Sequence, residues 1–283
     1  MKRKKDAGLL YMQELGIMPA KNAAQAREAL ERLPDHEALF RALTDDAAGP
    51  QEFYKVKNRD LPTSMAVNGA FSGDVYRKAC NVVDGAPELF GPEILDLGCE
   101  AGIMTCFLAK RFPGSRVTGT DLCPEAVAAA RELKAQLGTE NAVFTEAAGT
   151  RPSGSFDTVF SLRTMHENCD VPEDDAAGPA AYEDACAAAL RDYAEGLSAC
   201  LKPDGRILFI EREGSIFHEA APEDDVPVPE GADGRDALLR GFLRALSAAG
   251  LRPLKGSYRR ISAMEAGQES AFHAFVCELL KKC

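Results

Sequence analysis

One short stretch, residues 93–105 with the sequence "EILDLGCEAGIMT", limits the possible folds more than any other part of the chain. Its apolar run is typical of a buried strand and leads into a turn with two glycines, after which an apolar helical pattern begins. Glycine lets the backbone approach a ligand closely, because it carries no side chain. The stretch therefore predicts a strand, a bare turn and a helix, with a ligand site at the turn.

Strands and helices alternate from about residue 92 onward. The expected strands cover residues 94–97, 115–121, 141–146, 155–162, 202–211, 251–262 and 270–280, and the expected helices cover residues 102–112, 124–138, 180–201 and 235–250. This order predicts right-handed crossovers and an α/β fold with a doubly wound, mostly parallel seven-stranded sheet. Such sheets bind their ligands at the carboxyl ends of the strands.

Residues 1–90 have a different pattern. The segments "AQAREALERL" and "DHEALFRAL" have helical spacing. We therefore expect a helical N-terminal cap over residues 1–90 and an α/β domain over residues 91–283. The apolar stretch after the basic first residues is interrupted by Gln13 and Glu14, and it is too short for a secretion signal or a membrane span.

The nine cysteines are scattered without a CxxC pair. This pattern favours reduced thiols in a cytoplasmic protein, with neither a disulfide framework nor a metal site.

The net charge of −11 is concentrated in two segments. Residues 170–184 contain six acids, residues 213–234 contain seven, and neither segment contains a lysine or arginine. Both follow expected strands and so belong to the ligand side of the sheet. An acidic rim there would repel a phosphate backbone and attract a cationic substrate, so we expect no nucleic-acid partner. No membrane partner is expected either, since the N-terminal apolar stretch is too short. The alternative is a pair of solvated loops without a role in recognition.

The glycine spacing distinguishes between ligands. Gly98 and Gly102 form G-x-x-x-G, whereas a dinucleotide site would have G-x-G-x-x-G. Together with the motifs that follow it, "LDLGCEAG" resembles the first motif of the class I S-adenosylmethionine-dependent methyltransferases, and the resemblance covers residues 92–280. It implies a Rossmann-like fold, S-adenosylmethionine as cofactor and S-adenosylhomocysteine as product. The family usually has glycine where this chain has Glu100, a substitution we expect to be tolerated if the side chain faces solvent.

The resemblance also implies how the cofactor is held. Asp96 would favour the α-ammonium group, "VTGTDLCPEAV" would place Asp121 at the ribose hydroxyls, and "VFTEAAG" would place Glu146 at the adenine amino group. Taken alone, Asp121 could simply cap a helix and Glu146 could be a solvated loop acid, so the order and spacing of the motifs carry the inference. The expected cofactor contacts are Asp96, Leu97, Gly98, Cys99, Gly102, Asp121, Leu122, Glu146, Ala147 and Ser161.

Methyl transfer from a sulfonium mainly requires alignment, with a base where the acceptor must lose a proton. The candidate bases are His166 and Glu167, just beyond the fourth strand; His166 could equally cap or pack its loop. Residues 53–73 precede the first strand and are the expected acceptor-facing segment, although their aromatics also suit a core. The expected acceptor-binding residues are Tyr54, Phe71, Arg163 and His218.

The sequence thus predicts methyl transfer to an oxygen or nitrogen of a small-molecule acceptor. Two alternatives remain: a cofactor-binding regulatory or assembly protein without turnover, and a methyltransferase acting on protein or RNA. The motif [DN]-P-P-[FYW], typical of enzymes that methylate the adenine amino group, is replaced by "SLRT" after the fourth strand. Whether the cap is a lid, a homodimer contact or both is left open.

Overall fold

The computed structural model describes residues 6–34, 36–44, 49–150, 152–165, 167, 178–218 and 226–280. His166 therefore lies outside the described residues. So do residues 170–177 of the first acidic segment and residues 219–225 of the second. The chain forms two compact units, each built from several segments. The first unit comprises Met1–Glu88, Cys99–Glu146 and Ser262–Ser270, and the second comprises Leu89–Gly98, Ala147–Ile261 and Ala271–Cys283. A domain boundary at residue 90 stays a prediction.

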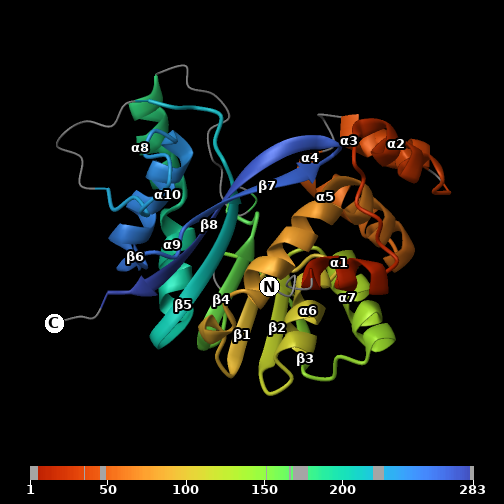
Figure 1. Ribbon diagram of the computed structural model, residues 1–283, viewed down its shortest axis with the longest axis horizontal. Helices are drawn as coiled ribbons and strands as arrows, with labels where there is room; N and C mark the ends of the chain where they lie inside the picture. The colour runs from red at the N-terminus through yellow and green to blue at the C-terminus, as the bar shows by residue number, and fades with distance from the viewer. Residues whose placement is uncertain are drawn as a thin grey trace, which may run out of the picture. The chain divides into compact units, whose positions relative to one another are not determined.

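The N-terminal part of the first unit is helical (Figure 1), with α1 (Ala7–Glu14), α2 (Ala23–Glu31), α3 (His36–Thr44), α4 (Gly49–Lys57) and α5 (Leu61–Asp84). Three of these helices begin at a side chain that accepts a hydrogen bond from a first-turn N–H, namely Asp6, Asn22 and Asp60. Apolar residues of α2, α3 and α5 form a core that includes Leu30, Leu39 and Val67.

The α/β part of the first unit contains α6 (Ile103–Arg111), β2 (Arg116–Asp121), α7 (Pro124–Leu137) and β3 (Ala142–Glu146). β2 and β3 are parallel, and their register places Asp121 opposite Glu146. Pro124 stands in the first turn of α7, and Gly138 ends the helix with a φ of 63°, so both predicted boundary signals are used.

The second unit begins near the single-turn 3₁₀ helix Pro87–Leu89 and contains most of the strands. β1 (Glu93–Leu97), β4 (Phe156–Leu162) and β5 (Leu201–Arg212) are parallel neighbours. β8 (Gln268–Leu279) runs antiparallel to β5 and to β6 (Leu251–Pro253), and β7 (Arg259–Glu265) pairs with β8. The helices α8 (Pro179–Ala189), α9 (Arg191–Cys200) and α10 (Ala237–Ala248) pack against these strands through Tyr193, Phe209, Phe242 and Phe275 (Figure 1).

The predicted α/β fold is confirmed, with two differences in detail. The described residues contain eight strands instead of seven, because residues 251–262 form β6 and β7 separated by a turn in which Gly256 has a φ of 74°. The expected helix at residues 180–201 is divided at Leu190, whose ψ of 0° departs from helical geometry while its side chain stays fully buried. Within the described part of the chain, no helix is long and apolar enough to cross a membrane.

Candidate functional site

The end of β1 has the geometry that a bare turn requires. Asp96 and Leu97 are buried, and Leu97 lies opposite Ser161 of the parallel neighbour β4. Gly98 follows with a φ of 67°, and a Cβ at this position would lie 2.3 Å from Cγ2 of Thr164. Any larger residue would therefore displace Thr164 as well as strain the backbone.

In the first unit, Cys99–Gly102 forms a tight turn before α6. The N–H of Cys99 donates to the carbonyl of Thr120 at 2.8 Å, and the N–H of Gly102 donates to the carbonyl of Cys99 at 2.8 Å. Gly102 has a φ of 77°, and a Cβ there would lie 2.8 Å from the ring of Phe144 and 2.9 Å from Cβ of Ala130. This glycine lets α6 begin close against β3 and α7.

Asp121 ends β2 with both carboxylate oxygens engaged. Oδ2 accepts the N–H of Glu100 at 2.8 Å, and Oδ1 accepts the N–H of Cys123 at 2.9 Å. Burial and the charge of Glu100 raise the pKa of Asp121 above its ordinary value, against the lowering effect of these N–H groups. Each carboxylate oxygen can accept two hydrogen bonds, so each retains capacity for a ligand hydroxyl. Leu122 beside it is 59% exposed, and Glu146 across the strand pair is exposed.

The side chain of Glu100 does not face solvent, so the condition under which the sequence would tolerate it in place of glycine is not met. Its carboxylate accepts hydrogen bonds from Asn68 Nδ2 at 3.0 Å and Tyr76 Oη at 3.1 Å, and Lys57 Nζ lies 2.6 Å away. Burial by itself raises the pKa of this carboxyl, but the charge of Lys57 and the three side-chain hydrogen bonds outweigh it, so the pKa is lowered. Helices α4 and α5 thus supply all the partners named here for a side chain of the turn.

A second polar cluster lies in the second unit, where β4 and β5 end. Oε1 of Glu211 accepts from Ser161 Oγ at 3.0 Å, and the hydroxyls of Ser161, Thr164 and Tyr193 lie within 2.6 to 3.1 Å of one another. Glu211 is 2% exposed, and its Oε2 has no hydrogen-bond partner among the described residues. Burial raises the pKa of Glu211 to about 8, despite the hydrogen bonds from Ser161 and Thr164.

The predicted catalytic and acceptor-binding residues are placed as follows. Glu167 is exposed, while His166 lies outside the described residues. Arg163 is half-buried with a φ of 57°, and its N–H donates to the carbonyl of Ile210. Nε2 of His218 lies 2.9 Å from Oε2 of Glu183 on α8, so the ring is engaged by that helix. These roles stay predictions.

Tyr54 and Phe71 belong to the first unit and have different surroundings. The ring centroid of Tyr54 is 5.7 Å from Lys57 Nζ, the same ammonium group that pairs with Glu100. Phe71 packs against the apolar core of α2, α3 and α5. This is the alternative given above, in which the aromatics of residues 53–73 belong to a core.

Several functional candidates carried no strong sequence signal. Lys57, Tyr76 and Glu211 each stand between an apolar residue and a charged or polar one, and such a position marks no site. A weak signal did exist on α5, where the four polar residues Ser64, Asn68, Ser72 and Tyr76 recur every fourth position and so share one helical face. All four are buried, which a solvated face would not be.

Comparison with known proteins identifies the kind of domain to which this turn and Asp121 belong. Residues 94–183 match a protein family described as a methyltransferase domain. This segment contains the four motifs, from "LDLGCEAG" to "FDTVFSLRTMHE", on which the predicted resemblance rests, and it is a methyltransferase domain. The predicted family and its cofactor, S-adenosylmethionine, are therefore confirmed.

Curated and solved relatives of this methyltransferase are distant. It is 27% identical over 198 residues to ribosomal RNA small subunit methyltransferase C of Salmonella choleraesuis (strain SC-B67), covering 62% of this chain and 58% of that protein. The protein of the same name from Escherichia coli (strain SMS-3-5 / SECEC) is 25% identical over 198 residues, covering 62% and 57%. A solved S-adenosylmethionine-dependent methyltransferase from Clostridium acetobutylicum ATCC 824 has a TM-score of 0.47 at 15% identity, covering 72% of this chain and 92% of that one. The chain thus spans a little over half the length of these curated relatives.

The expectation of no nucleic-acid partner is contradicted, because the curated relatives are named for ribosomal RNA. The structure shows why counting acids was misleading. Described acids of both segments are paired with arginines from other parts of the chain: Glu183 with Arg240 and Arg244, and Glu213 with Arg260. The local charge is therefore smaller than the acid count of the segments alone.

Proposed function

We propose that this methyltransferase transfers the methyl group of S-adenosylmethionine to a nitrogen or oxygen of an acceptor molecule. The observation that best supports this function is the Asp121 carboxylate. It stands at the end of a parallel strand, is oriented by the N–H groups of Glu100 and Cys123, and retains acceptor capacity for two adjacent hydroxyls. The exposed Leu122 beside it offers an apolar surface for an adenine ring.

RNA is the acceptor class that we propose first. The support is the similarity over 198 residues to proteins named as ribosomal RNA methyltransferases. The segment "SLRT", which stands in place of [DN]-P-P-[FYW], favours an acceptor atom other than the adenine amino group.

A small molecule is the second candidate, and the charge distribution favours it. Exposed acids such as Glu146 and Glu167 lie near the ends of β3 and β4, and they would attract a cationic small molecule. The two classes are separated by incubating the protein with methyl-labelled S-adenosylmethionine and either total RNA or a metabolite fraction from which RNA has been removed. Label in RNA supports the first candidate, and label only in the metabolite fraction supports the second. Cofactor binding without transfer to either would support a regulatory or assembly protein.

Replacing Asp121 by alanine is expected to weaken binding of S-adenosylhomocysteine roughly tenfold or more, because hydrogen bonds to a charged group are lost. Isothermal titration calorimetry measures the change. Glu140→Ala is the matched control, since Glu140 is an exposed acid just before the opposite end of β3. Equal affinities for Asp121→Ala and Glu140→Ala would contradict the assignment of Asp121 to the ribose.

A further inference from the structure

The turn that precedes α6 holds a non-glycine residue in left-handed backbone geometry. Glu100 has a φ of 48°, in the loop where the neighbouring Gly102 has a φ of 77°. For an ordinary residue this conformation is strained and persists only where the surroundings fix it. The conformation directs the N–H of Glu100 to Oδ2 of Asp121 at 2.8 Å.

What fixes Glu100 is its side chain. The carboxylate is bound by Lys57 at the end of α4 and by Asn68 and Tyr76 on α5. The side chains of Lys57 and Glu100 are only 9% and 16% exposed, so little solvent screens their attraction. The ammonium group also lies 5.9 Å and 5.7 Å from the ring centroids of Phe53 and Tyr54, which favours a cation at this point.

Lys57 is also the compensating charge for two acids. Glu100 and Asp121 are joined by one hydrogen bond, and the charge of Glu100 raises the pKa of Asp121 while the charge of Lys57 lowers it. Without Lys57, two neighbouring carboxyls would be left with less compensation in a largely buried place, which strongly disfavours the ionised pair.

Asn68, which binds Glu100, has one polar atom left to satisfy. Its Nδ2 group donates to Glu100 and to Ser64, but its Oδ1 atom is buried and has no hydrogen-bond partner among the residues described. A buried acceptor left without a donor destabilises the protein. A hydroxyl group of a bound ligand would remove that destabilisation.

We propose that Lys57 and Glu100 are positioning residues for the cofactor. Lys57 holds the carboxylate of Glu100, Glu100 holds the turn, and the N–H of Glu100 holds the carboxylate of Asp121 in the orientation that binds a ribose. Affinity for S-adenosylmethionine is thereby set in part by helices α4 and α5. This inference rests on the proposed function, because it presumes that Asp121 binds the cofactor.

The test is calorimetric titration of the full chain with S-adenosylhomocysteine. Lys57→Met is expected to weaken binding roughly tenfold or more, because it leaves the Glu100 carboxylate unpaired beside Asp121. Tyr76→Phe, which removes one hydrogen bond to Glu100 and keeps the ring, is expected to weaken binding by a smaller factor, on the order of threefold. The double variant Glu100→Gln/Lys57→Met removes both charges and is expected to bind within about threefold of the wild-type protein.

Recovery in the double variant shows that the weakening comes from the unpaired Glu100 carboxylate. Guanidinium unfolding of the same variants separates positioning from general stability, because positioning lowers cofactor affinity in protein that is still folded. Lys55→Met is the matched control, since Lys55 lies on the same helix and is exposed. Wild-type affinity in both Lys57→Met and Tyr76→Phe, or no recovery in the double variant, would overturn the inference and leave the proposed function intact. If the wild-type protein does not bind S-adenosylhomocysteine, the proposed function fails, and the inference fails with it.

Discussion

Replacing Glu211 by glutamine is expected to remove a large pH-dependent loss of stability between about pH 4.5 and pH 8. The wild-type carboxyl is fully buried at the end of β5, and burial raises its pKa from 4.5 to about 8. Glutamine has the same shape as the protonated acid and cannot ionise. The side chain at this position therefore stays neutral at high pH in the variant, whereas in the wild-type protein it must ionise in a buried place.

The direction follows from proton linkage. Below about pH 4.5 the carboxyl is protonated in the folded and the unfolded chain, so its contribution to folding is complete. As pH rises toward 8, the unfolded chain releases the proton while the folded chain keeps it, and the free energy of unfolding falls. At 1.36 kcal/mol per pKa unit, the loss approaches about 5 kcal/mol as an upper bound.

Denaturant unfolding of both proteins at pH 5, 7 and 9 measures this effect. The difference in unfolding free energy between Glu211→Gln and wild type should grow in favour of the variant as pH rises. Any packing effect of the substitution is independent of pH and cancels in this comparison. A constant difference at the three pH values would show that Glu211 does not carry a proton in the folded protein at neutral pH.

The fold was predictable where local pattern and tertiary structure agree. The bounds of β1 were predicted to within one residue from the apolar run at residues 94–97, and those of α7 from Pro124 and Gly138. At these places, neighbours in sequence decide burial and backbone geometry. The division of residues 180–201 at Leu190 was not predictable, since a helix break without glycine or proline leaves no local mark.

The candidate site was predictable only in its backbone part. The glycines of the turn and Asp121 carry signals of spacing and order, whereas the partners of Glu100 come from residues 24 to 43 positions away. Nothing in the sequence pairs Lys57 with Glu100, because that pairing is set by how α4 and α5 pack. The same reason applies to Glu211 and Tyr193, which meet Ser161 only through the neighbouring strand and a helix.

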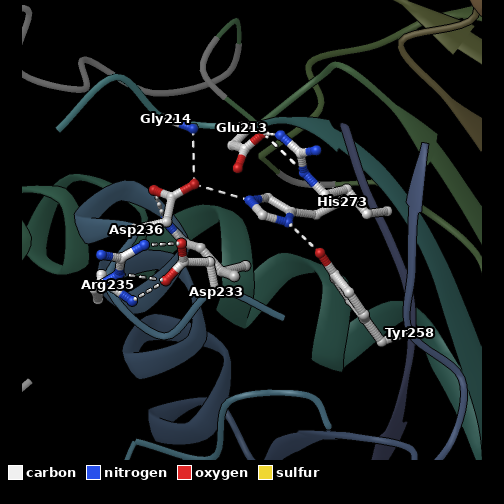
Figure 2. A network of polar contacts seen from close by, with 9 residues as sticks. Glu213, Gly214, Asp233, Arg235, Asp236, Tyr258 and His273 are labelled. Atoms are coloured by element: carbon white, nitrogen blue, oxygen red, sulfur yellow. Dashed lines mark hydrogen bonds and ion pairs between the residues drawn. The ribbon is translucent and has the colours of Figure 1, made fainter. Parts of the chain in front are cut away.

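Stability of the second unit depends on one further buried carboxyl, Asp236, at the start of α10 (Figure 2). Its Oδ1 caps α10 by accepting the N–H of Leu239 at 3.1 Å, while Oδ2 lies 2.8 Å from the N–H of Gly214 and 2.8 Å from His273 Nε2. A carboxylate only accepts, so Nε2 of His273 donates, and Nδ1 lies 3.1 Å from the Tyr258 hydroxyl. One fully buried side chain thus joins a helix, a loop and β8.

Asp236→Ala is therefore expected to lower the free energy of unfolding by about 3 kcal/mol or more, because it removes a helix cap and leaves the buried His273 and the half-buried N–H of Gly214 unpaired. Asp233→Ala is the matched control. Asp233 lies three residues earlier and pairs only with the exposed Arg235 in the contacts of Figure 2, so its loss should cost less than about 1 kcal/mol. Guanidinium unfolding at fixed pH compares the two variants. If they lose similar amounts of stability, the Asp236 contacts do not stabilise the second unit as the structure indicates, and the link between α10 and β8 must depend on apolar packing alone.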